Sequence, residues 1–181
     1  MYIDPVVHTG APDDTADREQ RETACYELLD RLGVEYFRVD HDPADTIEAC
    51  LEVEKAIGVG IFKNLFLCNR QKTDCYLLMM DGHKTFRTAD VSKKLGVSRL
   101  SFGTAEDMLR LLNVYPGSVS VLALMNDARG RVSLVIDRDV LRGEYVRCHP
   151  CKNTSTLKFK TTDLLGRVLP ALHRTPTVIE I

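Results

Sequence analysis

The chain has 181 residues, of which 44% are hydrophobic and 28% are charged, and this composition is typical of a globular protein. The length predicts one domain over residues 1–181, with a core that needs no disulfide framework. No apolar run approaches the roughly 18 residues of a membrane helix, and the acidic first residues lack the basic and apolar parts of a signal peptide. We therefore expect a cytoplasmic protein without a membrane-spanning segment.

Charge is unevenly distributed along the chain, although the net charge is only −2. Residues 1–54 contain 15 acidic and 4 basic side chains, whereas residues 138–174 contain 8 basic and 3 acidic ones. A basic region of this kind can bind an anionic partner such as a nucleic acid. Ordinary solvated surface produces the same pattern, so charge alone leaves both interpretations open.

The predicted elements follow from hydrophobic periodicity and from the turn residues between them. After an irregular start, helices are expected over residues 15–32, 46–57, 88–95, 104–112 and 161–172. Strands are expected over residues 34–39, 61–67, 75–80, 119–125, 132–136, 145–148, 155–159 and 178–181. Central strands, frequent hairpins and irregularly placed helices indicate an α+β fold, with a mixed, mostly antiparallel sheet surrounded by helices. No glycine-rich phosphate-binding motif follows a strand, so no nucleotide cofactor is expected.

The strand predicted over residues 61–67 carries two polar side chains near its start. Side chains alternate between the faces of a strand, so Lys63 and Asn64 point in opposite directions. A lysine in an apolar row needs a partner, solvent or a ligand for its ammonium group. Lys63 is thus either a solvent-reaching lysine at a strand end or a functional residue. Both side chains can share one pocket only if the strand begins irregularly, which Gly58 and Gly60 would allow.

The segment Cys148-His149-Pro150-Cys151 has the spacing of a cysteine motif. Two cysteines at this spacing can exchange thiols and disulfides, or they can supply half of a zinc site. The sequence has no second ligand pair, and the segment lies late in the chain rather than in an early βαβ unit, so its context disfavours both roles. The other cysteines are expected to be small buried hydrophobic residues, namely Cys25, Cys50, Cys68 and Cys75.

The loop Pro116-Gly117-Ser118-Val119 is a second candidate for function. Glycine allows the backbone to approach a ligand closely, and consecutive backbone amides can stabilise the oxyanion that develops on an ester under attack. Taken alone, the same four residues are also typical of a plain turn between a helix and a strand.

Three segments together resemble a known family. They are residues 63–67 (Lys-Asn-Leu-Phe-Leu), residues 116–119 followed by Leu124 and Asn126-Asp127, and residues 149–154 (His-Pro-Cys-Lys-Asn-Thr). In this order they resemble the YbaK/prolyl-tRNA synthetase-associated editing domains, and within them the freestanding ProX-type deacylases of Ala-tRNA(Pro). Residues 41–46 resemble the His-x-Pro-x-x-Thr stretch of that subgroup. The resemblance covers about residues 22–172 and leaves residues 1–21 as an N-terminal extension.

The resemblance implies an aminoacyl-tRNA hydrolase that acts in trans on mischarged tRNA(Pro), with Ala-tRNA(Pro) as the expected substrate. A water molecule attacks the ester in this family, so the resemblance implies no metal and no other cofactor. It implies Lys63 and Asn64 as catalytic residues. It also implies a set of substrate-binding residues, namely Thr46, Gly117, Ser118, His149 and Asn153.

Several alternatives stay open within and beyond this resemblance. Where the family often continues Thr-Pro-Phe after the glycine loop, this chain has Ser120-Val121-Leu122, so the amino acid removed is open and Cys-tRNA(Pro) is the alternative substrate, ahead of Ser-tRNA. A non-catalytic module that binds tRNA or a synthetase is a second hypothesis, and a thiol redox protein is a third. The expected partner is the acceptor end of tRNA, bound through the basic residues 138–174, and prolyl-tRNA synthetase is a candidate partner.

Overall fold

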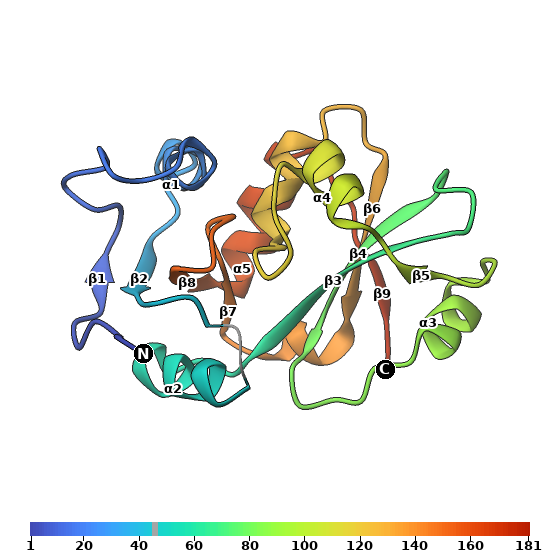
Figure 1. Ribbon diagram of the computed structural model, residues 1–181, viewed down its shortest axis with the longest axis horizontal. Helices are drawn as coiled ribbons and strands as arrows, with labels where there is room; N and C mark the ends of the chain where they lie inside the picture. The colour runs from blue at the N-terminus through green and yellow to red at the C-terminus, as the bar shows by residue number, and fades with distance from the viewer. Residues whose placement is uncertain (45–46) are drawn as a thin grey trace.

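The structure is a computed structural model that describes residues 1–44 and 47–181. Two β-sheets lie side by side along the long axis of the molecule, with helices packed around them (Figure 1). The expected α+β class is confirmed, but the strands form two sheets where one was predicted.

The two sheets differ in the direction of their strands. The first sheet is antiparallel throughout and has the order β1 (His8–Thr9), β2 (Tyr36–Asp40), β8 (Ser155–Lys160) and β7 (Tyr145–Cys148). The second sheet has the order β5 (Ser101–Phe102), β3 (Phe62–Cys68), β4 (Cys75–Asp81), β6 (Val132–Asp137) and β9 (Thr177–Ile179). In the second sheet β3 is antiparallel to both neighbours, whereas β6 is parallel to β4 and to β9. These parallel pairs are possible because long connections separate the strands in sequence.

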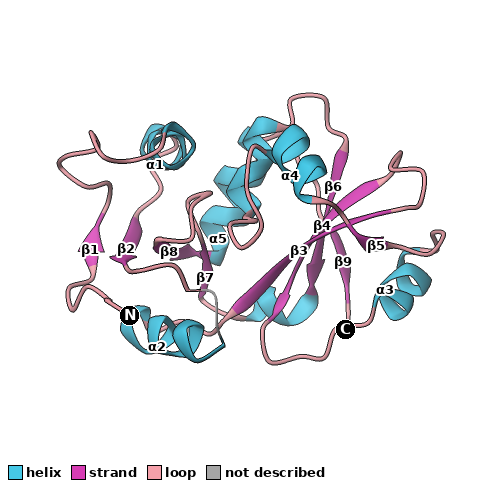
Figure 2. Cartoon of the chain, viewed as in Figure 1, coloured by secondary structure: helices cyan, strands magenta, loops and turns pink. Residues whose placement is uncertain are grey.

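Helices cover both sheets, with α1 and α2 beside the first sheet and α3 beside the second (Figure 2). The α-helices are α1 (Gln20–Arg31), α2 (Ile47–Ile57), α3 (Thr88–Leu95), α4 (Ala105–Leu112), α5 (Thr161–Asp163) and α6 (Leu169–Ala171). The other helical segments are the 3-10 helices η1 (Val121–Asn126) and η2 (Arg138–Arg142) and the π-helical η3 (Leu164–Val168). Among the described residues, none of these helices combines the length and the hydrophobicity that a membrane crossing requires.

Strand β3 packs its two faces against two separate groups of core residues. Phe66 belongs to the larger group and Leu67 to the smaller one, and both side chains are buried. The predicted alternation of β3 is therefore confirmed. The pairing of β3 with β4 is regular from Phe62 onward, with no residue skipped on either strand. The irregular start that would let Lys63 and Asn64 share a pocket is therefore wrong.

The strand predicted over residues 119–125 is also wrong, because this part of the chain forms η1. The apolar side chains of Val121 to Leu124 are all buried, and an apolar run buried on every side does not distinguish a strand from a helix. The hydroxyl oxygen of Ser120 accepts a hydrogen bond from the Leu122 amide at 3.2 Å and so begins the helical turn.

Two helix starts, those of α4 and α1, differ in how well they agree with the prediction. The helix predicted from residue 104 has Thr104 as its cap, because the hydroxyl of Thr104 accepts a hydrogen bond from the Asp107 amide. The helix predicted from residue 15 begins only at Gln20, because the Asp14 carboxylate accepts a hydrogen bond from the Ala16 amide in a local turn.

Cys68 and Cys75 correct a prediction, because they form a disulfide instead of remaining free buried residues. They lie directly opposite each other at the ends of β3 and β4, with Cα atoms 4.2 Å apart. A hairpin that brings two cysteines into register in this way places them close enough to be joined by a disulfide.

The segment Cys148 to Cys151 contains free thiols and no disulfide. The Sγ atom of Cys151 lies 3.4 Å from that of Cys25 on α1, and the side chains of Cys25, Cys148 and Cys151 are all buried. Burial raises the pKa of Cys148 to about 12, so this thiol is protonated at neutral pH and is a poor nucleophile.

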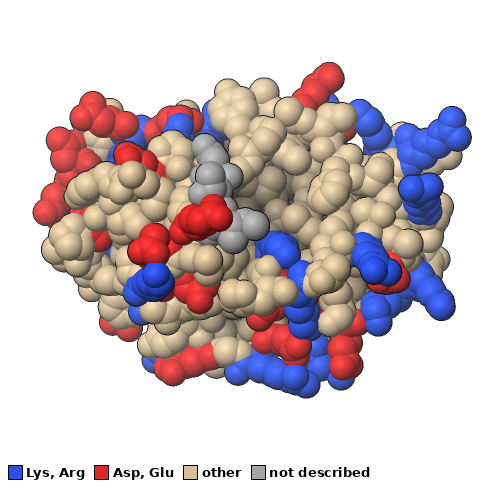
Figure 3. All heavy atoms as spheres, turned by 60° about the horizontal axis from the view of Figure 1, so that its bottom comes forward, with Lys and Arg blue, Asp and Glu red and all other residues tan. Residues whose placement is uncertain are grey.

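Charged side chains separate along the long axis of the molecule. Figure 3 shows acidic side chains gathered at the end that holds β1 and α1, and basic side chains at the opposite end, which holds β5 and α3. The acidic first third of the sequence thus occupies one end of the protein.

Candidate functional site

A cavity of about 220 Å³ lies where β3 of the second sheet meets the loop that follows β7 of the first. Three of the predicted site residues line it, namely Asn64, Gly117 and His149. The rest of the wall is mostly apolar and is supplied by Phe62, Leu65, Phe66, Phe102, Met108, Pro116 and Val119. A small, mostly apolar cavity with a few converging polar groups is typical of a binding site.

Strand β3 presents Asn64 to this cavity at an edge that is open over part of its length. On one side β3 pairs with β4 throughout, but on the other side β5 pairs only with Leu67 and Cys68. The Oδ1 atom of Asn64 is buried and accepts no hydrogen bond from any described residue. A buried polar atom without a partner is destabilising, so this oxygen is available to a donor on a ligand.

The glycine loop forms a tight turn that brings Gly117 to the cavity. The Ser118 amide donates a hydrogen bond to the Tyr115 carbonyl at 3.0 Å, and Gly117 has a φ of 84°, which favours glycine. The backbone amide of Ser118 therefore closes the turn, and the side chain of Ser118 is buried. Of Gly117 and Ser118, only Gly117 is among the residues that line the cavity.

His149 lines the cavity as a neutral imidazole. Its Nδ1 atom lies 2.7 Å from the backbone oxygen of Ser155, so Nδ1 carries the proton and donates to that carbonyl. Burial lowers the pKa of His149 to about 4, well below the ordinary value for histidine. At neutral pH the lone pair on Nε2 can therefore accept a hydrogen bond from a water molecule or a ligand.

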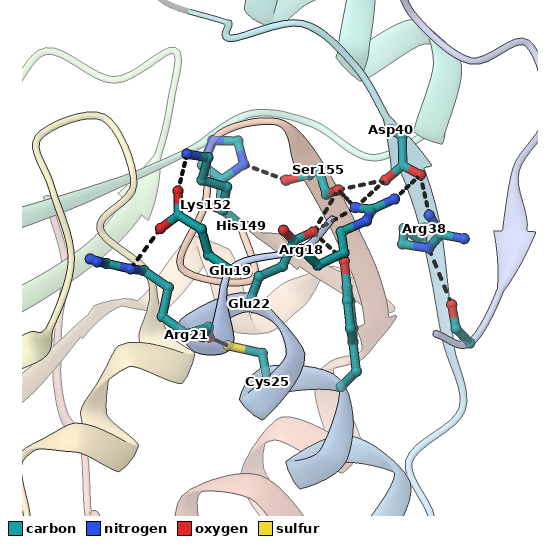
Figure 4. Close-up of polar contacts among 12 residues, drawn as sticks. Arg18, Glu19, Arg21, Glu22, Cys25, Arg38, Asp40, His149, Lys152 and Ser155 are labelled. Carbon is teal, nitrogen blue, oxygen red and sulfur yellow. Dashed lines mark hydrogen bonds and ion pairs between the residues drawn. The ribbon is translucent and has the colours of Figure 1, made fainter. Parts of the chain in front are cut away.

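Ser155, which anchors His149, belongs to a network of charged side chains (Figure 4). Arg18 donates to the Ser155 hydroxyl at 2.9 Å and to the Asp40 carboxylate at 2.6 Å. Burial alone would raise the pKa of Asp40, but hydrogen bonds from Arg18, Ser155 and Arg38 hold it at about 2. The ionised Asp40 keeps Arg18 and Ser155 in place. It thereby fixes the first residue of β8, whose carbonyl accepts the hydrogen bond from His149.

A second contact joins the same two parts of the chain. Lys152, in the loop between His149 and Ser155, forms an ion pair with Glu19, which directly precedes α1 (Figure 4). Residues 18–25 therefore hold the loop 149–155 through an ion pair, hydrogen bonds and the contact between Cys25 and Cys151.

Lys63 lies apart from the cavity described above. Its ammonium group donates a hydrogen bond to the backbone carbonyl of Lys84 at 2.8 Å, and the regular register of β3 directs it away from Asn64. Asn153 lies in the same loop as His149, but neither Lys63 nor Asn153 is among the described residues that line the cavity. Thr46, the remaining predicted site residue, lies outside the described residues.

Sequence reasoning missed the aromatic wall of the cavity. The alternation of a strand predicts that Phe62 and Phe66, each two residues from Asn64, share its face of β3, but the two aromatic side chains were not assigned to the site. Phe102 and Met108 reach the cavity from β5 and α4, and no local pattern connects them with β3.

Most of the basic residues of the C-terminal third have partners within the chain. Five of the eight form ion pairs with carboxylates, and Arg147 and Lys158 donate to the backbone carbonyls of Val59 and Ile57. These two bonds hold the connection between α2 and β3 against the first sheet. Most of the basic side chains in residues 138–174 therefore have a partner within the chain, although those of Arg138, Arg142 and Arg167 are more than half exposed.

The chain is similar to known proteins over most of its length. A family model described as "Aminoacyl-tRNA editing domain" matches residues 41–166. The prolyl-tRNA editing protein ProX of Acetoanaerobium sticklandii is 29% identical over 153 residues, which are 84% of this chain and 93% of that protein. The prolyl-tRNA synthetase associated domain-containing protein 1 of Mus musculus is 32% identical over 146 residues, which are 77% of this chain and 86% of that protein.

A solved structure shares the fold. The crystal structure of "a putative trans-editing enzyme for prolyl tRNA synthetase" aligns with a TM-score of 0.64 at 15% sequence identity and covers 90% of this chain and 98% of that one. The match to the family model begins at His41, so Arg18 and Glu19 lie outside it although they contact the loop that carries His149.

Proposed function

The chain belongs to the aminoacyl-tRNA editing domain family, and from this premise we propose that it hydrolyses the ester bond of mischarged tRNA(Pro), with Ala-tRNA(Pro) as its substrate. The observation that carries the proposal is the cavity that joins the unpartnered Oδ1 of Asn64, the glycine turn and a neutral His149. The similarity to the ProX protein and to proteins named for prolyl-tRNA synthetase supports the choice of tRNA.

The three polar groups suit the chemistry of ester hydrolysis. In the reaction a water oxygen bonds to the ester carbonyl carbon, the bond from that carbon to the ribose oxygen breaks, and the ribose oxygen leaves with a proton. Nε2 of His149 accepts a hydrogen bond from the attacking water and orients it. Gly117 lines the cavity, and its amide is proposed to donate to the developing oxyanion, while Oδ1 of Asn64 is proposed to accept a hydrogen bond from the α-ammonium group of the aminoacyl ester.

A physical argument supports alanine as the amino acid removed. A synthetase pocket that accepts proline rejects a smaller side chain by only about 1–3 kcal/mol per methylene, so a second site that admits only the smaller residue is required. The chain departs from the family at Ser120, which precedes η1, and at Val121 and Leu122, which begin it. All three residues are fully buried, and none of them lines the cavity. The adjacent Val119 does line it, and Cys-tRNA(Pro) remains the alternative substrate.

Lys63 remains part of the proposal as a catalytic residue, together with Asn64. Its ammonium group has to leave the Lys84 carbonyl and pass the open edge of β3 to reach the ester or its phosphate. Thr46, Ser118 and Asn153 are proposed to help bind the substrate. Editing in trans also implies a cytoplasmic location and contact with prolyl-tRNA synthetase.

The test is a panel of Ala-, Cys- and Ser-tRNA(Pro), incubated with the wild type and with the Lys63→Ala and His149→Ala variants. We expect the wild type to release alanine fastest and both variants to be inactive. Binding without release of any amino acid would favour the non-catalytic module, a hypothesis to which the distant Lys63 ammonium lends support. Replacement of Cys148 and Cys151 by serine is expected to leave deacylation intact, which would exclude the thiol redox role.

A further inference from the structure

A second, larger hollow adjoins the cavity that contains Asn64. It has a volume of about 640 Å³ and lies between the turn that joins β3 to β4 and the segment that contains β5. Arg70, Lys72, Arg99 and Phe102 are among the residues that line it. Phe102 lines the smaller cavity as well, so this side chain borders both spaces. We call the larger space the hairpin groove.

Phe102 is an exposed aromatic side chain in a fixed position. It is 59% exposed, although its backbone pairs with Leu67 in the edge strand β5. Its ring is tilted against that of Phe86, with the ring centroids 5.5 Å apart. The adjacent Gly103 donates its amide to the Phe66 carbonyl at 2.9 Å, which ties this edge to β3. An exposed ring held by such contacts can serve as a platform on which a nucleobase stacks.

The hairpin groove also carries positive charge that the fold does not use. Within the described part of the chain, neither Arg70 nor Arg99 forms an ion pair with a carboxylate, and both side chains are exposed. Lys72 differs, because its ammonium group lies 2.8 Å from the Asp107 carboxylate. The groove lies at the basic end of the molecule in Figure 3. These two guanidinium groups contrast with the basic residues 138–174, most of which are paired.

We propose that the hairpin groove binds the single-stranded 3′ end of the tRNA, with a base stacked on Phe102 and backbone phosphates on Arg70 and Arg99. This inference rests on the proposed function, because it requires the terminal aminoacyl-adenosine to occupy the cavity beside Asn64. A single strand fits better than a duplex, since its bases are free to stack on an aromatic ring while its phosphates contact the flanking arginines. The acidic end of the molecule, at β1 and α1, would repel the same phosphates.

Binding of a short single-stranded RNA that ends in CCA, without an amino acid attached, tests the proposal directly. Phe102→Ala is expected to weaken binding about 5- to 150-fold, the effect of losing one stacked base. Phe102→Tyr keeps the ring and should restore affinity. The double variant Arg70→Gln/Arg99→Gln should lower the slope of log affinity against log salt by about 1.4, since each phosphate contact on a single strand contributes about 0.7.

Arg31→Gln is the matched control, because Arg31 is an exposed arginine near the end of α1 and far along the chain from the groove. It removes the same charge and should leave RNA affinity unchanged. Equal RNA affinity in the wild type, Phe102→Ala and the double variant would overturn the proposal. The proposal would also fail if these changes weakened binding to prolyl-tRNA synthetase but not to RNA, since the groove would then be a protein-docking surface.

Activity separates this inference from the proposed function. Hydrolysis of 3′-O-alanyl-adenosine, which is too short to reach Arg70 and Arg99, should be unaffected by the double variant Arg70→Gln/Arg99→Gln, whereas hydrolysis of Ala-tRNA(Pro) by this variant should show a raised KM. If the wild type hydrolyses Ala-tRNA(Pro) and the groove variants do so equally well, the groove proposal fails and the function stands. If the wild type hydrolyses no aminoacyl-tRNA but binds RNA through these side chains, the function fails and the groove stands.

Discussion

His149 donates a hydrogen bond from Nδ1 to the backbone carbonyl of Ser155 at 2.7 Å, across the loop that joins β7 to β8. This contact fixes the tautomer of the ring and leaves the lone pair of Nε2 able to accept a hydrogen bond, and His149 is one of the residues that line the cavity. Because burial keeps the ring neutral, its role is to accept a hydrogen bond rather than to supply a positive charge.

The titration of His149 should therefore differ from that of an ordinary histidine. We expect its ring resonances to move with a pKa near 4 in an NMR titration, and we expect deacylation to show no inflection from this residue near pH 6.5. The variant His149→Asn can still donate to the Ser155 carbonyl through its side-chain amide but lacks Nε2. It should fold and be inactive. A ring that titrates near pH 6.5 would contradict the neutral role.

Stability should depend on pH in the same window. The pKa of His149 is about 4 in the folded state and about 6.5 in the unfolded state, so between these values the unfolded chain binds more protons. The free energy of unfolding should accordingly increase as the pH is raised from 4 to 6.5. Urea denaturation across this range measures the effect. His149→Asn should flatten only part of it, because burial also lowers the pKa of the neighbouring His41.

Arg18 is expected to support the site from outside the residues matched by the family model. Arg18→Met removes the hydrogen bonds to Ser155 and Asp40 and leaves the buried Glu22 without its cation. Leaving a largely buried carboxylate unpaired should lower the free energy of unfolding by about 3 kcal/mol. The matched control is Arg31→Met at the end of α1. The side chain of Arg31 is exposed, so this change should alter the free energy of unfolding by less than about 0.5 kcal/mol.

Activity at low temperature distinguishes a role of Arg18 in positioning from a role in stability alone. If Arg18 holds the loop that carries His149, kcat of Arg18→Met should fall even where the variant is fully folded, whereas KM should change little. An unchanged kcat under those conditions would restrict Arg18 to stability.

Local patterns in the sequence predicted much of the fold. The alternation of β3, the hairpin that it forms with β4 and the helix that follows residue 104 each depend on residues close together in the chain, and the structure confirms them. The disulfide between Cys68 and Cys75 was missed, although two cysteines at the ends of a predicted hairpin are a local signal. The run Val121 to Leu124 was wrongly predicted as a strand. Its side chains are all buried, so the sequence lacks the hydrophobic periodicity that distinguishes a helix from a strand.

The site was predictable only in part, because its geometry depends on distant pairings. The family resemblance identified Asn64, Gly117 and His149, which the fold brings to one cavity. The hydrogen bond from Arg18 to Ser155 spans 137 residues, and no periodicity or motif reports such a contact. The position of Lys63 was left undecided by the sequence, since it depends on whether β3 begins regularly.

Asn64 should show a trade between stability and activity. Its buried Oδ1 accepts no hydrogen bond from the described residues, so replacement by the similarly sized leucine removes an unfavourable burial. Asn64→Leu is expected to raise the free energy of unfolding by about 1 kcal/mol while abolishing deacylation. Thermal unfolding and the release of alanine from Ala-tRNA(Pro) measure the two effects. A less stable variant would indicate that Oδ1 has a partner in the free protein, such as a bound water molecule.

Lys63 gives the sharpest separation between the enzyme and a non-catalytic module. Lys63→Met removes the ammonium group but keeps the length and apolar character of the side chain, so the single hydrogen bond to the Lys84 carbonyl is lost at a cost of about 1–2 kcal/mol. If the ammonium group passes the edge of β3 to meet the substrate, deacylation should fall at least about 100-fold, as expected for the loss of one electrostatic stabiliser of the transition state. Lys63→Arg retains the charge and should retain part of the activity. Full activity in Lys63→Met would show that Asn64, Gly117 and His149 act without this lysine, and that its place on the opposite face of β3 is structural.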